Sequence, residues 1–231
     1  MTVLKFSFGR ISWAGFVDQY VMLIRRVMQA VFGGARREES ARPGDAGPRG
    51  AARAGGAGLI SDEYRKMQQQ LHENPNYGVA SIHYAPVVAQ VIEAVGAQEL
   101  LDYGAGKGRL GLTLRQHIKR PLTIHHYDPA IPEWSAPPRP CGFVACIDVL
   151  EHIEPTLLDN VLDDLQRVTA GVGVFTVHTG AAVKFLPDGR NAHLIQQPPA
   201  WWLPKFLARF ELATFNRMQM GFWVVVERKQ P

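Results

Sequence analysis

Cysteine is scarce in this chain, and no group of residues has the spacing of a metal site. Only two of the 231 residues are cysteines, Cys141 and Cys146, and two thiols cannot build the disulfide framework of a small secreted domain. No Cys-x-x-Cys pair and no cysteine–histidine run is present. We therefore predict two buried, reduced cysteines, a reducing compartment and a site without a metal ion.

Long apolar runs are also missing. A membrane-spanning helix needs about 20 consecutive apolar residues, and charged residues interrupt residues 1–32 too often for that. Apolar side chains nevertheless recur at helical spacing from Phe16 to Phe32, with Arg25 and Arg26 on the other side. A basic amphipathic helix of this kind is typical of a segment that lies on a membrane surface or in a partner's groove. The alternative is a helix that packs on the chain's own core.

The globular part of the chain lacks an excess of basic residues. Residues 1–58 carry nine Lys and Arg against four Asp and Glu, whereas the remainder carries 16 against 17, so the net charge of +4 belongs to the N-terminal arm. These totals disfavour nucleic acid as a partner, although the arm could bind phosphates. Residues 33–58 are almost wholly small, polar, glycine or proline, which predicts a flexible linker. We expect a domain at 59–231 and a cytoplasmic protein, with 1–32 as a peripheral contact at the inner face of the membrane.

Glycine is concentrated in residues 100–114, LLDYGAGKGRLGLTL. An apolar strand leads through Asp102, Gly104, Gly106 and Gly108 into a helical pattern, an order that brings backbone N–H groups and a helix N-terminus to a ligand. Dinucleotide-binding turns place the third glycine one residue later, and a P-loop has Ser or Thr after its lysine. A carboxylate just before the turn would repel a pyrophosphate, but it suits an ammonium group. The turn therefore favours neither of those two ligands.

This turn resembles the first motif of the class I S-adenosylmethionine (SAM)-dependent methyltransferases. Two later segments, HHYDP at 125–129 and CIDVLEHI at 146–153, resemble the family's acidic ribose-binding position and its fourth motif. The resemblance implies SAM as the cofactor, held by Asp102, Tyr103, Gly104, Ala105, Gly106 and Gly108 at the methionine part, by Asp128 and Pro129 at the ribose, and by Asp148 and Val149 beside the methyl donor.

The alternation of strand and helix patterns up to residue 179 predicts an α/β fold with a mostly parallel, Rossmann-like sheet and helices on both faces. The last two β-rich runs predict an antiparallel C-terminal hairpin. Only 14 residues separate Asp128 from Phe143, and a parallel crossover cannot fit there. We therefore predict that the family's third strand is missing. Trp134 in this proline-rich piece could cover an adenine, or it could simply pack.

Methyl transfer to a hydroxyl requires a base, and histidine titrates near neutral pH. His193, in a polar loop after the last parallel strand, is our first candidate, and His152 is the second. The alternative is that Glu151 and His152 only stabilise a turn. Glu151, His152 and Asp188 could be recruited to a metal, but no spacing demands it.

The acceptor that we expect is a hydroxyl of a small molecule or of a lipid-linked glycan. RNA or protein methylation and a non-catalytic scaffold that acts through residues 1–32 remain alternatives. A nicotinamide-dependent oxidoreductase is disfavoured by Asp102 and by the glycine spacing.

Overall fold

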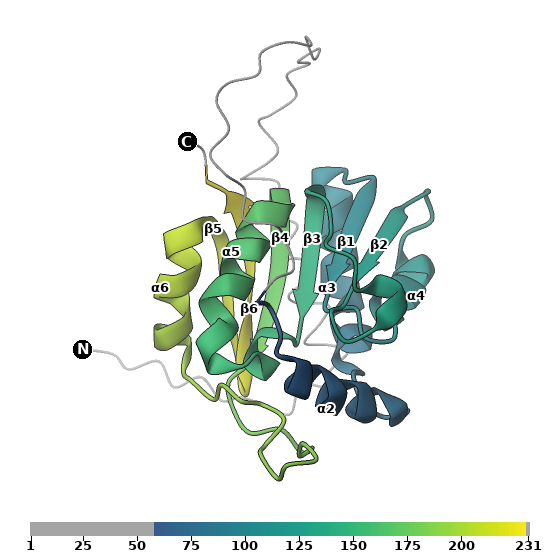
Figure 1. Cartoon of the computed structure of the whole chain (residues 1–231). Coiled ribbons are helices and arrows are strands. Elements are labelled where there is room, and N and C mark those ends of the chain that lie inside the picture. Colours follow the sequence, from purple (N-terminus) through teal and green to yellow (C-terminus); the bar gives the residue numbers. More distant parts are fainter. Residues whose placement is uncertain (1–57, 230–231) are drawn as a thin grey trace, which may run out of the picture.

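The structure is a computed structural model that describes residues 58–229, which form a six-stranded sheet with helices on both sides (Figure 1). The predicted amphipathic segment 1–32 and the predicted linker, up to residue 57, lie outside the described residues. The elements are α2 (Asp62–Glu73), α3 (Ala80–Val95), β1 (Glu99–Tyr103), α4 (Arg109–His117), β2 (Thr123–Tyr127), η1 (Pro132–Trp134), β3 (Cys141–Ile147), η2 (Leu150–His152), η3 (Pro155–Leu157), α5 (Leu158–Val168), β4 (Thr169–His178), α6 (Pro199–Arg209), β5 (Phe210–Met218) and β6 (Gly221–Arg228).

The strand order is β2-β1-β3-β4-β6-β5. The four strands from β1 to β4 are parallel, while β6 pairs antiparallel with both β4 and β5. The predicted Rossmann-like sheet with a C-terminal hairpin is therefore confirmed. Because β1 and β3 are neighbours and their chain connections run to opposite sides, their carboxyl ends border the crevice in which open α/β sheets bind ligands.

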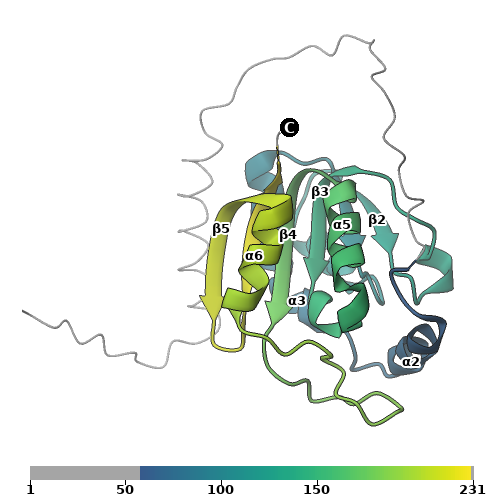
Figure 2. The same cartoon turned by 60° about the vertical axis from the view of Figure 1, so that its left-hand side comes forward.

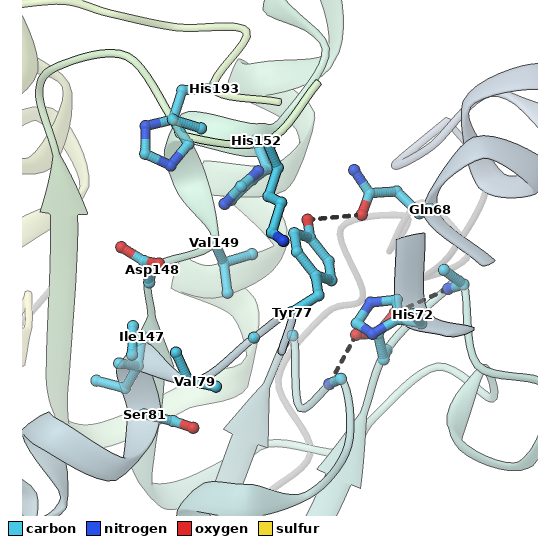
Figure 3. Close-up of a pocket in the computed structure, with 18 of the residues that line it drawn as sticks. Gln68, His72, Tyr77, Val79, Ser81, Ile147, Asp148, Val149, His152 and His193 are labelled. Carbon is cyan, nitrogen blue, oxygen red and sulfur yellow. Dashed lines mark hydrogen bonds between the residues drawn. The ribbon is translucent and has the colours of Figure 1, made fainter. Parts of the chain in front are cut away.

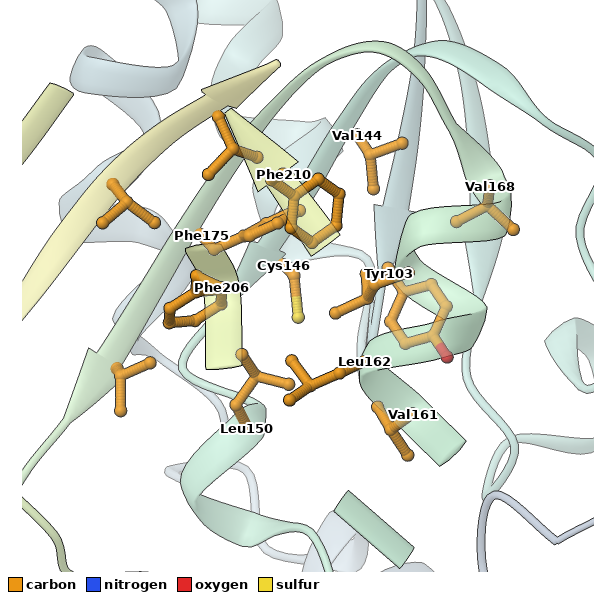
Figure 4. Close-up of a cluster of buried hydrophobic side chains, with 14 of the residues drawn as sticks. Tyr103, Val144, Cys146, Leu150, Val161, Leu162, Val168, Phe175, Phe206 and Phe210 are labelled. Carbon is orange, nitrogen blue, oxygen red and sulfur yellow. The ribbon is translucent and has the colours of Figure 1, made fainter. Parts of the chain in front are cut away.

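Two apolar layers hold the helices on the sheet, and β3 supplies both of them. Val144 and Cys146 face α5 and α6, whereas Phe143 and Ala145 face α3 and α4. This alternation explains why β3 reads as a continuous apolar run, since it is buried on both faces. Figure 2 shows α5 and α6 on one side of the sheet with α3 behind it, and Figure 4 shows the core under α5 and α6, where aromatic rings surround Cys146.

The segment between β2 and β3 contains no strand. It holds a single turn of 3₁₀ helix, η1, and folds back so that the backbone N–H of Asp128 donates to the carbonyl of Trp134 at 3.0 Å. Consequently β2 is an edge of the sheet. The prediction that the third strand is missing is confirmed, and its reason is length: 129–140 can turn but cannot cross over and return.

Two boundaries differ from the sequence expectation. Apolar residues at helical spacing predict a helix that starts at about Ile82 or Pro86 and ends at Val95, but α3 begins at Ala80, so that Pro86 lies inside it. The apolar run VGVFTVHT predicts a strand at 172–179, but β4 begins at Thr169, because it pairs with β3 from Cys141 onwards. Among the helices of residues 58–229, none combines the length and the apolar character required to cross a membrane.

Candidate active site

A cavity of about 520 Å³ opens at the carboxyl ends of β1, β3 and β4 (Figure 3). The cavity is bordered by Asp102 near the end of β1 and Gly104 just after it, by Asp148 just after β3, and by His178 at the end of β4. The helix α2 and the residues that follow it cover the same end of the sheet, as Figure 1 shows. The volume of the cavity lies within the range of small-molecule sites.

The glycine turn after β1 is held by backbone hydrogen bonds to β2. The N–H groups of Gly104 and Ala105 donate to the carbonyl of Tyr127 at 2.8 and 3.0 Å. Gly104 has φ +79°, and a Cβ built on it would lie 2.4 Å from a methyl of Val149. This position therefore requires glycine for two reasons, the left-handed backbone and the contact with the turn that follows β3.

Asp102 is a buried acid with a carboxyl oxygen that makes no hydrogen bond. It is 3% exposed, and burial raises its pKa while His126 opposes the rise. Its Oδ2 lies 3.4 Å from Nδ1 of His126, within ion-pair distance, but the two atoms make no hydrogen bond and Oδ2 has no other partner. An unsatisfied carboxylate oxygen at a cavity wall fits a positively charged ligand group.

Asp128 ties together the two loops on the other side of this turn. Its Oδ2 accepts from the N–H of Gly106 and its Oδ1 from the N–H of Ala130, both at 2.9 Å. A carboxylate has about four acceptor positions, so each oxygen can also accept a hydroxyl. Asp128, Pro129 and Ala130 all line the cavity. The geometry suits a ligand that offers two adjacent hydroxyl groups.

Comparison with solved structures identifies this arrangement. The 1,6-didemethyltoxoflavin-N1-methyltransferase of Burkholderia thailandensis, with bound substrate and S-adenosylhomocysteine (SAH), is 14% identical; the match covers 79% of this chain and 94% of that one at a TM-score of 0.54. The N-methyltransferase NodS of Bradyrhizobium japonicum WM9, in complex with SAH, is 10% identical over 73% of this chain and 100% of that one, at a TM-score of 0.52. The chain has the class I SAM-dependent methyltransferase fold. No protein-family model and no curated protein sequence matches it.

Of the ten cofactor residues expected in this methyltransferase fold, eight line the cavity. The other two do not. The hydroxyl of Tyr103 donates to Asp164 in the core at 2.9 Å, and Gly108 caps the N-terminus of α4, where a Cβ would lie 3.1 Å from Trp134. Trp134 stacks on His126, with ring centroids 4.5 Å apart. Trp134 thus packs behind the glycine turn and does not line the cavity.

Both candidate histidines line the cavity, with their ring centroids 4.7 Å apart (Figure 3). Nδ1 of His152 lies 2.8 Å from the carbonyl oxygen of Ala192, and Nδ1 of His193 lies 2.7 Å from that of Gly180. A carbonyl oxygen only accepts, so each Nδ1 carries the hydrogen and each Nε2 keeps a lone pair. Burial lowers both pKa values, that of His152 to about 4, although Asp148 opposes the shift. Both rings are therefore neutral at pH 7.

The turn after β3 is strained and internally supported. Asp148 has φ +59°, an uncommon value outside glycine, and its N–H donates to Oγ1 of Thr176 at 2.8 Å. Glu151 is fully buried and accepts from the N–H of His178 at 2.6 Å. Burial and then the Asp148 carboxylate raise the pKa of Glu151 far above its usual range. Glu151 therefore stabilises the turn, whereas His152 beside it reaches the cavity.

Several polar side chains of the loop that contains His193 make structural contacts, although the composition of the loop suggests that they bind a ligand. Asp188 and Arg190 form an ion pair at 2.6 Å. The side-chain oxygen of Asn191 accepts from the backbone N–H of Ala182 at 2.9 Å and so holds the loop in place. Asp188 is therefore not available for the metal set considered from sequence.

The roof of the cavity was not predicted. His72 and Gln68 of α2, together with Tyr77 just after it, line the cavity. The Tyr77 hydroxyl donates to Oε1 of Gln68 at 3.0 Å (Figure 3). Nε2 of Gln68 donates to the Tyr64 hydroxyl at 2.6 Å, and that hydroxyl donates to the carbonyl of His152 at 2.5 Å. This relay connects the roof with the histidine wall. The only sign of these bonds in the sequence is that Tyr64 and Gln68 are four residues apart and therefore lie on one face of a helix.

Ser61 fastens the start of α2 to the body. Its Oγ accepts from the N–H of Tyr64, and its own N–H and hydroxyl donate to the Glu154 carboxylate at 2.8 and 2.7 Å. We expect Ser61→Ala to lower the free energy of unfolding by about 2 kcal/mol, since it removes a helix cap and a charge-assisted hydrogen bond. Thermal unfolding should show a fall in Tm of about 5 °C. Ser135→Ala, which removes one exposed turn bond, is the matched control, and an equal fall in both variants would contradict the anchoring role.

Proposed function

We propose that the protein is a SAM-dependent methyltransferase that acts on a hydroxyl group of a small molecule. One observation supports this most strongly: one cavity is lined both by the glycine turn with Asp102 and Asp128, which form its first wall, and by two neutral histidines, which form its second, the histidine wall. The first wall suits the cofactor and the second suits an acceptor that must lose a proton. In the Burkholderia thailandensis neighbour the bound substrate is also a small molecule.

The residues on the first wall fit SAM. The unpartnered Oδ2 of Asp102 can take the ammonium of its methionine part, and the Asp128 carboxylate can take the two ribose hydroxyls while it keeps its bonds to Gly106 and Ala130. When bound, SAM supplies a methyl group on a positively charged sulfur. The protein's own task is then to orient the acceptor, to exclude water and to remove a proton.

The histidine wall favours oxygen over nitrogen as the acceptor atom. The fold alone does not choose, since both neighbours described above are N-methyltransferases. A neutral amine already has a free lone pair, whereas a hydroxyl must lose its proton as its oxygen gains the methyl group. The Nδ1 contacts of His152 and His193 leave a lone pair on each Nε2, which can accept such a proton.

The proposal is tested first by binding. Calorimetry with SAH and the full chain should show one site, and the absence of binding would overturn the cofactor assignment. Turnover is then sought with labelled SAM and fractionated extracts of small polar metabolites and glycans, with mass spectrometry to find products heavier by one methylene. A lipid-linked acceptor would suit the segment at 1–32, whose membrane contact stays a prediction.

His193→Asn separates transfer from cofactor binding. The asparagine amide can replace the Nδ1–H that donates to Gly180 but has no counterpart of Nε2. We expect the rate of transfer to fall by about 100-fold or more while the Kd for SAH changes less than about threefold. His117→Asn alters an exposed histidine at the end of α4 and should retain the full rate. Unchanged turnover in His193→Asn would remove the histidine wall from the chemistry.

A further inference from the structure

Three side chains that line the cavity form a group that could hold a metal ion. Asp148, His152 and His193 each offer one ligand atom, and these atoms lie within 4.8 Å of one another. An ion with bonds of about 2.1 Å spans up to about 4.2 Å between opposite ligands. A small rotation of these side chains therefore brings their ligand atoms close enough together for all three to bind the same ion. We propose that Asp148, His152 and His193 bind one divalent transition-metal ion.

The hydrogen bonds behind the two histidines support this proposal independently of the cluster itself. Metal-binding histidines usually donate their second ring N–H to a carbonyl or a carboxylate, which orients the ring and frees the other nitrogen. His152 makes this bond to Ala192 at 2.8 Å, and His193 makes it to Gly180 at 2.7 Å. Ala192 directly precedes His193, so the first bond also positions the second ligand.

The backbone places the carboxylate. Asp148 is the one non-glycine residue with positive φ among residues 58–229, and such strain is typical of functional positions. Its N–H bond to Thr176 on β4, at 2.8 Å, holds this conformation. The turn thereby brings a carboxylate oxygen of Asp148 within 4.8 Å of a ring nitrogen of His152 and of His193, and Figure 3 shows the three side chains in the same part of the cavity.

The donor set selects the class of ion. Two imidazoles with one carboxylate suit Zn²⁺, Fe²⁺, Co²⁺ or Mn²⁺, whereas Mg²⁺ and Ca²⁺ prefer oxygen ligands. Three protein ligands also leave at least one coordination position toward the cavity. This proposal departs from the sequence expectation of a metal-free site, which had only spacing to judge from. His193 is separated from the other two by α5, β4 and a loop.

Binding of the ion is independent of methyl transfer, but its role in transfer rests on the proposed function. An acceptor hydroxyl bound at the open position would have a lower pKa, because a divalent ion stabilises the oxyanion. His152 and His193 would then act as ligands, and the coordinated oxygen would release its proton more readily.

Cobalt is a suitable probe because its visible absorption reports nitrogen coordination. The full chain, freed of metal with a chelator, is titrated with Co²⁺ while absorbance is recorded. We expect one Co²⁺ per chain, displaced by Zn²⁺ in accordance with the usual affinity order. His193→Asn and Asp148→Asn should both lose the band. Asparagine is well tolerated at positive φ, so Asp148→Asn keeps the backbone of the turn, and thermal unfolding verifies that it folds. His117→Asn should keep the band.

Two results would overturn the proposal: no band in the wild type at one equivalent of Co²⁺, or a band that persists in both ligand variants. SAH calorimetry on the same metal-free samples distinguishes this outcome from failure of the proposed function. SAH binding and turnover without a Co²⁺ band would leave the methyltransferase assignment intact and remove the ion. A Co²⁺ band without SAH binding would support the metal site and overturn the methyltransferase assignment.

Discussion

Gly104→Ala should nearly abolish binding of SAH. Alanine at φ +79° is strained by about 1–2 kcal/mol, and its Cβ would lie 2.4 Å from a methyl of Val149. Real contacts of this kind are much longer, so the turn after β1 and the turn after β3 must separate. Both turns line the cavity. We expect the Kd for SAH, measured by calorimetry, to rise by about 100-fold, or about 2.7 kcal/mol.

The chain offers a matched control for the backbone strain. Gly189 has a similar φ of +85°, but a Cβ there would meet nothing within 4 Å. Gly189→Ala should therefore lose some stability and keep its affinity for SAH. Adding Val149→Ala to Gly104→Ala should restore part of the binding, because the two closest methyl carbons disappear. Equal effects of the two glycine variants on affinity would show that the contact with Val149 is unimportant.

Asp128→Asn should have a comparable effect through a different cause. The Asp128 carboxylate accepts one backbone N–H on each oxygen, from Gly106 and from Ala130. An amide has only one oxygen, so whichever way it turns its NH₂ group meets a second donor. Hydrogen bonds to a charged group contribute about 1.5–3 kcal/mol each. We expect an affinity for SAH about 100-fold weaker, together with a lower Tm.

Asp188→Asn serves as the control for Asp128→Asn. Asp188 pairs with Arg190 at the protein surface and has no contact with the glycine turn, so its substitution should leave calorimetric binding unchanged. If Asp128→Asn bound SAH as tightly as the wild type, the ribose assignment and the tie between the two loops would both be wrong.

The fold was predictable where a residue's neighbours along the chain determine its surroundings. Apolar runs of strand length, separated by amphipathic helices, fix a parallel sheet, and side chains at the ends of β1, β2 and β3 then converge. Asp102, Asp128 and Asp148 all line the cavity for this reason. The missing strand was predictable as well, because the reach of a short proline-rich segment is a geometric limit.

Other parts of the site depend on contacts that no local pattern encodes. His126 lies opposite Asp102 because β1 and β2 pair in that register, and a shift of one residue would have turned it to the other face. His72 reaches the glycine turn only because α2 docks across the end of the sheet, where a Cβ on Gly106 would lie 3.0 Å from its ring. Likewise, the loop after β4 brings His193 to His152. Docking of helices and loops decides these pairs.

The placement of α2 couples the binding of a ligand in the cavity to the docking of this helix on the rest of the domain. Tyr77 and His72 line the cavity, while Ser61 and Tyr64 hold the same segment on the body. A ligand that contacts the first pair gains free energy only while the second pair stays engaged. By reciprocity, anything that strengthens the docking of α2 raises the ligand's affinity by the same factor, and anything that pulls α2 away lowers it. In the sequence, α2 begins at Asp62, four residues after the end of the predicted linker at 33–58. The helix that covers the site is therefore the first helix of the chain after that linker.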